Sequence, residues 1–389
     1  MSTGPIAVGI MKMDVAGEDA RDLSQLTRRA TEQFRRVLER EPRLRVTSLT
    51  FDGPPLTPND NGYPALDFVQ LGINEKTERR LAFLLIVTEV EIAAASLSYL
   101  LALPSQLTNV AILSTRRLAD YGDARTDDTD LMANRLGNLM LHCFGRLLNL
   151  PYAHDPTNYL ARIEVPADLD AMDRYTEAQF QAMAANLPEE ANDRYSTRNH
   201  LAFVLSQATS NLPRIVRGAL RANPLRIATK LPTMIATALS VIVLLIFGGE
   251  TWDFAASVSP GQLTFFVVAS FVTATFVLYR AFSFRLVATR QGAIAESSVV
   301  TAGATYLALV LTLGCLFVFF GLAMYAVVWF VFPDPLMSTW TSARDGSTAG
   351  AHFRLVVFLA SVGILSGSLG GSADSRSVVR NVLFAVDET

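Results

Sequence analysis

The stretch that decides the fold is Leu139–Asp155, LMLHCFGRLLNLPYAHD. Together with one residue just upstream, its apolar residues recur at helical spacing and predict one buried face of a helix. That face comprises Leu136, Leu139, Met140, Cys143, Phe144, Leu147 and Leu148. We expect the helix to stop at Asn149–Pro151, because Asn is common just past a helix end and proline cannot continue a helix.

The frame of this stretch resembles the zinc helix of the metzincin metalloproteases, HExxHxxGxxH, and above all the archaemetzincin form, HExGHxxGLxH. Three residues match the archaemetzincin pattern: His142, Gly145 and Leu150. Four others replace the family's glutamate, second His, bend Gly and third ligand: in that order Cys143, Arg146, Asn149 and Tyr152. The resemblance covers about residues 5–185 and implies an α+β, metzincin-like soluble domain. Leu160 or Ala161 falls near the place of the family's Met-turn methionine.

The residues themselves argue against the family chemistry. A zinc peptidase needs two imidazoles one helical turn apart, a glutamate beside the first, and a third ligand after a bend. Arg146 has no lone pair to give and brings a permanent cation. Cys143 is a poor general base. We therefore expect a pseudo-metalloprotease: not an enzyme, no zinc, and a helix kept as packing core.

A remodelled metal site is the alternative. The residues of ligand type near the helix end are His142, Cys143, His154 and Asp155. No pair among these has a recognised metal spacing, and the one candidate pair is His142 with His154 across the bend. His154-Asp155-Pro156 is more typical of a turn capped by a side chain.

Composition divides the chain into a soluble and a membrane half. The 389 residues are 50% hydrophobic, with mean hydropathy +0.30. Nearly all long apolar runs follow Leu231, which predicts a helical membrane bundle there. The net charge of −3 and pI near 5.9 argue against nucleic-acid binding. Two cysteines in different regions imply no disulfide framework, and the first thirty residues show no signal peptide.

We therefore predict four consecutive regions. They are a degenerate archaemetzincin-like cytoplasmic domain (1–190), a basic amphipathic helical connector (191–230), four transmembrane helices (231–372) and a cytoplasmic tail (373–389). The four spans are expected at about 231–248, 263–279, 303–332 and 355–371. Arg and Lys concentrate before the first span, in the second loop and in the tail, so the positive-inside rule places both termini in the cytoplasm.

Basic residues are spaced along the connector among Ile, Val and Leu. They are Arg214, Arg217, Arg221, Arg226 and Lys230. This pattern predicts an amphipathic segment lying on an anionic inner leaflet, or a solvated connector whose charge sets the topology.

The apolar runs contain no Asp, Glu, Lys, Arg or His, which argues against ion-coupled transport but not against a passive pore. Gly363, Gly367 and Gly371 repeat every four residues and predict close helix packing. The partner helix belongs either to a second copy, to another membrane protein, or to the same bundle.

The leading functional hypothesis is a catalytically inactive, protease-like membrane protein that binds, scaffolds or assembles a protein or peptide at its cytoplasmic cleft. The first alternative is a homo-oligomeric channel or pore capped by the soluble domain. The second is a metal-dependent hydrolase with a remodelled ligand set. The lipid bilayer is a partner in every case, and no cofactor is expected.

Overall fold

The computed structural model describes residues 5–14, 23–58, 62–93, 100–119, 129–190, 194–196, 198–229, 231–281, 294–331 and 348–370. Lys230, Gly371 and the predicted tail lie outside these residues. The chain forms two compact units, which we describe separately. Unit 1 comprises Met1–Ser210, Leu286–Thr301 and Phe384–Thr389, and unit 2 comprises Asn211–Arg285 and Ala302–Leu383.

Unit 1 is built on a mixed sheet with strand order β2-β1-β4-β7-β6. The strands are β1 (Ile6–Met13), β2 (Val46–Asp52), β4 (Phe83–Thr88), β6 (Ala102–Ser105) and β7 (Val110–Ser114). The first four in spatial order run parallel, and β6 is antiparallel to β7. Because strands and helices alternate along most of this unit, its sheet is largely parallel, where the sequence predicted an α+β arrangement.

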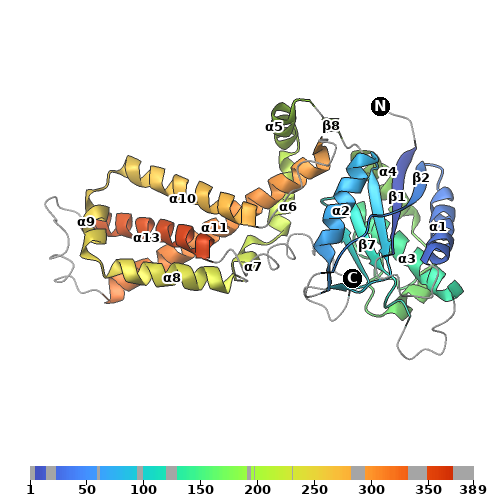
Figure 1. The fold of residues 1–389 in the computed structure, drawn as a ribbon, viewed down its shortest axis with the longest axis horizontal. Coiled ribbons are helices and arrows are strands. Elements are labelled where there is room, and N and C mark those ends of the chain that lie inside the picture. Colours follow the sequence, from blue (N-terminus) through green and yellow to red (C-terminus); the bar gives the residue numbers. More distant parts are fainter. Residues whose placement is uncertain are drawn as a thin grey trace. The chain divides into compact units, whose positions relative to one another are not determined.

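Helices cover both faces of the sheet (Figure 1). The helices α1 (Leu23–Glu39) and α3 (Thr129–Leu147) lie on one face, and α2 (Ala65–Glu78) lies on the other. On the first face, the ring of Phe144 meets the rings of Phe34 and Phe83 edge-on, each at 5.5 Å. On the second, a Cβ at Gly72 would lie 2.8 Å from both Ile86 and Val110, so α2 packs closely.

Smaller elements complete unit 1. They are β3 (Tyr63–Pro64), β5 (Ile92–Ala93), the 3-10 helix η1 (Pro166–Ala171), α4 (Glu177–Glu190), β8 (Tyr195–Ser196) and α5 (His200–Ser210). A later segment returns to this unit: β9 (Ile294–Ala295) pairs with β8, and the first turn of α11 (Glu296–Val331) follows it. The buried Lys76 Nζ donates to Ser297 Oγ at 3.2 Å, and Thr301 Oγ1 donates to the Leu107 carbonyl at 3.0 Å.

The described residues of unit 2 form helices. They are α6 (Leu212–Arg221), α7 (Pro224–Thr229), α8 (Pro232–Ile246), α9 (Gly249–Ser257), α10 (Pro260–Ala281), the rest of α11, and α13 (Thr348–Gly370). In the part of the chain that the structure describes, three helices are long and apolar enough to cross a membrane, or four if α8 and α9 count as one bent span.

The first predicted span differs from its prediction. The 15 residues of α8 reach about 22 Å, less than the ~30 Å of a hydrocarbon core. The chain then bends by 90° into α9, where the sequence predicted a loop. The Trp252 indole donates to the Ile246 carbonyl at 2.8 Å and is 2% exposed, so it holds this bend.

The glycines of α13 face α8 of the same chain. A Cβ at Gly367 would lie 2.8 Å from the Met234 carbonyl oxygen, and one at Gly363 would lie 2.5 Å from Ile242. The small residues therefore allow two helices of unit 2 to approach each other closely.

Candidate functional site

The helix α3 ends where the sequence predicted. Asn149 adopts a left-handed φ of 61°, and its N–H donates to the Arg146 carbonyl at 3.0 Å. The Leu150 N–H donates to the Gly145 carbonyl at 3.2 Å, which closes the last turn. Asn tolerates this backbone conformation better than most residues. It therefore makes the bend at the position where the metzincin motif has glycine.

His142 is fully buried near this end of α3. Its Nδ1 lies 2.8 Å from the Tyr159 carbonyl oxygen, which only accepts, so Nδ1 carries the proton and Nε2 carries the lone pair. Burial lowers the pKa of His142 to about 4; the Tyr159 hydrogen bond raises this pKa and the Arg146 charge lowers it further. The ring is thus neutral at physiological pH. Among the described residues, its Nε2 meets no hydrogen-bond partner.

Tyr152 brings the remaining motif positions together. Its ring centroid lies 6.0 Å from that of His142 and 4.0 Å from the guanidinium carbon of Arg146. Arg146 also donates to the Leu150 carbonyl. A second guanidinium, that of Arg162, lies 5.4 Å from the same ring. The place of the motif's ligands thus holds one imidazole and one aromatic ring flanked by two cations.

The other predicted donors are elsewhere. Cys143 belongs to the hydrophobic core, and His154 is exposed. Asp155 caps the turn after α3 by accepting from the N–H and hydroxyl of Thr157, at 3.0 and 2.9 Å, and it pairs with Arg174 at 3.1 Å. The Thr157 N–H, then its hydroxyl, then Arg174 lower the pKa of Asp155. Within the described ranges, no three His, Cys, Asp or Glu side chains gather as a metal site.

These residues test the fit of a zinc ion at the motif positions. The unpartnered Nε2 of His142, on a ring whose other nitrogen donates to a backbone carbonyl, is suited to bind a metal. A zinc site needs three or four such donors, and a guanidinium offers none. With Arg146 at the second position, the described residues do not fit zinc bound through the motif.

A polar network that the sequence did not reveal holds the first half of α3. Arg135, 2% exposed, makes a bidentate pair with Asp170 of η1, both bonds 2.7 Å, and donates to the Leu118 carbonyl at 2.6 Å. The Asn138 amide donates to the carbonyls of Leu169 and Met172, at 2.8 and 3.0 Å. A search for amphipathic periodicity assigns such polar residues to the exposed face of a helix, so it does not predict that they are buried.

The segment after α3 contains Leu160 and Ala161, one of which was expected near the place of the Met-turn methionine. Leu160 is fully buried, and a Cβ at Gly145 would lie 2.7 Å from its Cδ2. The Tyr175 hydroxyl donates to the Leu141 carbonyl from the same side. Burial raises the pKa of Tyr175 well above its usual value. Leu160 and Tyr175 therefore support the second half of α3 from this segment.

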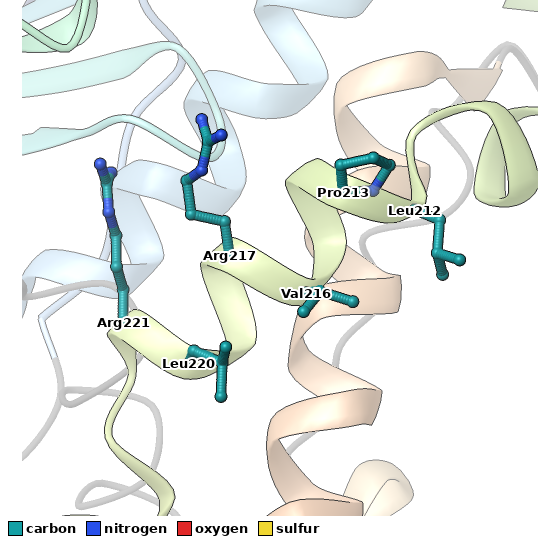
Figure 2. A pocket seen from close by; sticks show the side chains of 6 residues that line it. All are labelled: Leu212, Pro213, Val216, Arg217, Leu220 and Arg221. Carbon is teal, nitrogen blue, oxygen red and sulfur yellow. The ribbon is translucent and has the colours of Figure 1, made fainter.

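The second candidate site is the surface of α6, which carries three of the predicted membrane-surface arginines. Figure 2 shows Leu212, Val216 and Leu220 projecting from one side of this helix, and Arg217 and Arg221 from the other. The apolar three are 55%, 38% and 60% exposed, and all five residues line a hollow of about 730 Å³ with Pro213. The inner face is buried: a Cβ at Gly303 of α11 would lie 3.0 Å from Ile215. Of the other predicted cations, Arg214 is half-buried and Arg226 is exposed.

No family model and no curated protein matches this sequence. Solved structures are similar to part of it. An archaemetzincin from Methanopyrus kandleri is 16% identical with a TM-score of 0.38, covering 47% of this chain and 96% of that one. A zinc-dependent peptidase from Methanocorpusculum labreanum is 17% identical with a TM-score of 0.37, covering 46% and 99%. An archaemetzincin from Archaeoglobus fulgidus is 14% identical with a TM-score of 0.34, covering 46% and 99%.

These structures bear on the predictions in two ways. The similar structures include archaemetzincins, as the resemblance predicted, and they cover somewhat less than half of the chain. Two other predictions are wrong and are corrected here: that the chain is not an enzyme, and that zinc is not expected. The similar structures are archaemetzincins and a zinc-dependent peptidase, so neither absence is retained.

Proposed function

We propose that the protein is a membrane-anchored binding module whose protease-like unit 1 is held at an anionic membrane surface by α6. The observation that supports this is the exposed apolar side of α6, formed by Leu212, Val216 and Leu220. In water these side chains would leave apolar area unburied, whereas in a membrane interface they enter the acyl region. Arg217 and Arg221 each follow one of the apolar residues by one position, about 100° round the helix, so their long side chains can reach lipid phosphates beside the inserted face.

The return of residues 294–301 to unit 1 supports a definite topology. Because β9 pairs with β8 and Ser297 contacts Lys76, this segment lies on the same side of the membrane as unit 1. The chain between Ser210 and Ile294 must therefore cross an even number of times. We propose that α10 is one crossing and that the bent pair of α8 and α9, which together are apolar enough to span, is the other. With α11 and α13 this makes four crossings and puts both termini on one side, which the positive-inside rule assigns to the cytoplasm.

Depth measurements on the full chain test the role of α6. Spin labels at Val216→Cys and Leu220→Cys, in a Cys315→Ser background, are compared with a label at Leu49→Cys, which is 49% exposed in unit 1. Cys143 is fully buried and stays unlabelled. In vesicles with anionic lipid, we expect oxygen to reach the two α6 labels more readily than a water-soluble nickel chelate. The same preference for the nickel chelate at all three positions would overturn the proposal.

Cysteine accessibility tests the topology. Ser257→Cys at the end of α9 and Leu49→Cys in unit 1 are treated with a membrane-impermeant maleimide in sealed, uniformly oriented vesicles. We expect one position to react before lysis and the other only after it. Reaction of both from the same side would show that α8 and α9 do not cross.

The surface around Tyr152 supports a candidate for the bound partner, a protein or peptide with a free carboxylate. Arg146 and Arg162 both lie over the Tyr152 ring, and among the described residues Arg162 contacts no carboxylate. The exposed guanidinium of Arg162 can bind a carboxylate through paired N–H groups, and the buried charge of Arg146 on the same ring adds to the attraction. This site extends the binding function and does not depend on α6.

Titration of the full chain with an acetylated dipeptide, and with its amide-capped form, tests this site. We expect the free acid to bind at least fivefold more tightly, and Arg162→Gln to remove the difference. Arg36→Gln, an equally exposed arginine on α1, is the control and should keep it. Equal binding of both peptides would contradict the site. Loss of binding after chelation would instead place a metal at His142 Nε2 and favour the remodelled metal-dependent hydrolase.

A further inference from the structure

A second hollow lies in unit 1, away from α3, and it is lined only by polar side chains. Its volume is about 380 Å³, which lies in the range of small-ligand sites. The lining residues are Lys12, Ser24, Arg28, Thr31, Glu32, Arg35, Ser48 and Thr50. They comprise three cations, four hydroxyls and one carboxylate, with no apolar side chain among them.

The fold brings these residues together in a regular way. Arg28, Thr31 and Arg35 lie three or four residues apart, with Ser24 one turn before them, so they form one stripe along α1. Ser48 and Thr50 alternate along β2 and pair in register with Val8 and Ile10, whose side chains face α1. The hollow thus lies between α1 and the edge strand β2. If these sides of α1 and β2 packed against the hydrophobic core, apolar residues would be expected on them.

Lys12 sits near the carboxyl end of β1, next to the first turn of α1. Its Nζ lies 2.8 Å from Asp52 Oδ1 and donates to Ser24 Oγ at 3.0 Å, and its side chain is 18% exposed. An ammonium has three N–H groups, so one remains to be donated. In open sheets with parallel strands, ligands commonly bind beyond the carboxyl ends of the strands.

The charges around the hollow identify the group that takes an anion. Two of the three cations are already paired: Lys12 with Asp52, and Arg35 with Glu39 at 3.4 Å. Within the described residues, the guanidinium of Arg28 has no carboxylate partner. An anion would therefore bind to Arg28, to the third N–H of Lys12 and to the hydroxyls other than that of Thr31, which donates to the Thr27 carbonyl. Glu32 would accept from a hydroxyl of the ligand.

We propose that this hollow is a binding site for a small hydroxylated phosphate monoester. The monoester supplies two negative charges and three acceptor oxygens, which match a guanidinium, an ammonium N–H and several hydroxyls. The Glu32 carboxylate selects for a hydrogen-bond donor on the rest of the ligand. Nothing in this site depends on the membrane surface of α6 or on the end of α3.

Calorimetric titration of the full chain in a phosphate-free detergent tests the proposal, with glycerol 3-phosphate as the probe. We expect saturable binding with one site per chain, at least tenfold weaker in Arg28→Gln and changed less than twofold in Arg36→Gln. Both variants remove one exposed arginine from α1, but Arg36 does not line the hollow. Dimethyl phosphate, a diester with one charge, should bind at least tenfold more weakly than the monoester.

A second arm separates a soluble ligand from a lipid headgroup. Vesicles that contain phosphatidic acid are compared with vesicles of phosphatidylcholine alone, and competition by glycerol 3-phosphate is measured in each. Competition that depends on Arg28 in phosphatidic acid vesicles only would assign the site to a lipid monoester and keep its chemistry. Equal weakening by Arg28→Gln and Arg36→Gln, or no saturable binding, would overturn the site.

Discussion

The helices α3 and α6 contrast in what they bury and what they expose. On α3, polar side chains such as Arg135 and Asn138 are buried, and unit 1 itself supplies their hydrogen-bond partners. On α6, apolar side chains such as Leu212 and Leu220 are exposed. Buried polar groups with internal partners belong to the architecture of a domain. An exposed apolar stripe points to surroundings other than water.

The strongest way to break this contrast is to remove the partner of a buried charge. Asp170→Ala leaves the Arg135 guanidinium buried without its carboxylate. Losing one partner of a buried pair costs about 3–5 kcal/mol, and the partial exposure of Asp170 places the expected loss near 3 kcal/mol. Hydrogen exchange of the α3 amides in the full chain measures it.

Asp173→Ala is the matched control for that change. The Asp173 carboxylate is exposed and meets Arg174 only at 4.0 Å, so we expect less than 0.5 kcal/mol. Equal losses from the two variants would show that the buried pair is not special.

A comparable effect is expected from pH. The pKa of buried His142 is about 4, against 6.5 in an unfolded chain. Above pH 6.5 the ring is neutral in both states and contributes nothing; as the pH falls from 6.5 to 4, only the unfolded state takes up the proton. The stability of unit 1 should therefore fall by about 3 kcal/mol over this window.

Exchange of the α3 amides at several pH values, corrected for the intrinsic rate, measures this loss. His142→Gln should flatten the dependence, because glutamine does not titrate. An unchanged pH dependence in this variant would place the responsible group elsewhere.

A change on the exposed side of α6 should affect α6 alone and leave the stability of unit 1 unchanged. Leu220→Ser removes apolar area that unit 1 does not bury, so the exchange protection of α3 should stay the same. In vesicles with anionic lipid, α6 itself should lose about 1 kcal/mol of protection, because less apolar surface enters the interface. Exchange of α6 amides measures this loss, and an effect on α3 instead would contradict the contrast.

The smallest effect is expected at the ring of Tyr152. Arg162→Gln removes an exposed guanidinium 5.4 Å from the ring centroid, and such contacts contribute about 0.5 kcal/mol. Chemical denaturation, monitored by hydrogen exchange in the segment after α3, measures this loss of stability. Arg36→Gln is the control. A loss above about 2 kcal/mol would mean that Arg162 is structurally essential and not a binding residue.

Much of unit 1 could be predicted from the sequence because its signals are local. The apolar run of β4 and the helical period of α3 each identify an element without knowledge of its neighbours. The sequence of β6, ALPS, gives a weaker signal because Pro104 argues against a strand unless the strand lies at an edge, as it does here. The bend from α8 into α9 was not predicted, because composition shows that a segment is apolar but not the angle at which the next helix follows it.

The candidate site was predictable only where a motif fixed the spacing. His142, Arg146 and Tyr152 were expected to lie together because the resemblance to the zinc helix assigned them positions around one point. Arg162 joins them through the fold of the following turn, and its neighbours in YLARIEV give no signal for it. The partners of Arg135 are similarly distant, since Asp170 follows it by 35 residues.

The completion of unit 1 by residues 294–301 has a consequence for biosynthesis. A ribosome makes β8 about a hundred residues before β9. Its partner strand β9 therefore emerges only after α8 and α10 have been made. Unit 1 therefore cannot finish folding on its own, and the buried Lys76 lacks its Ser297 partner until then. Correct insertion of the first membrane segments becomes a precondition for a finished soluble domain, so a chain threaded wrongly into the bilayer leaves an incomplete domain for quality control to recognise.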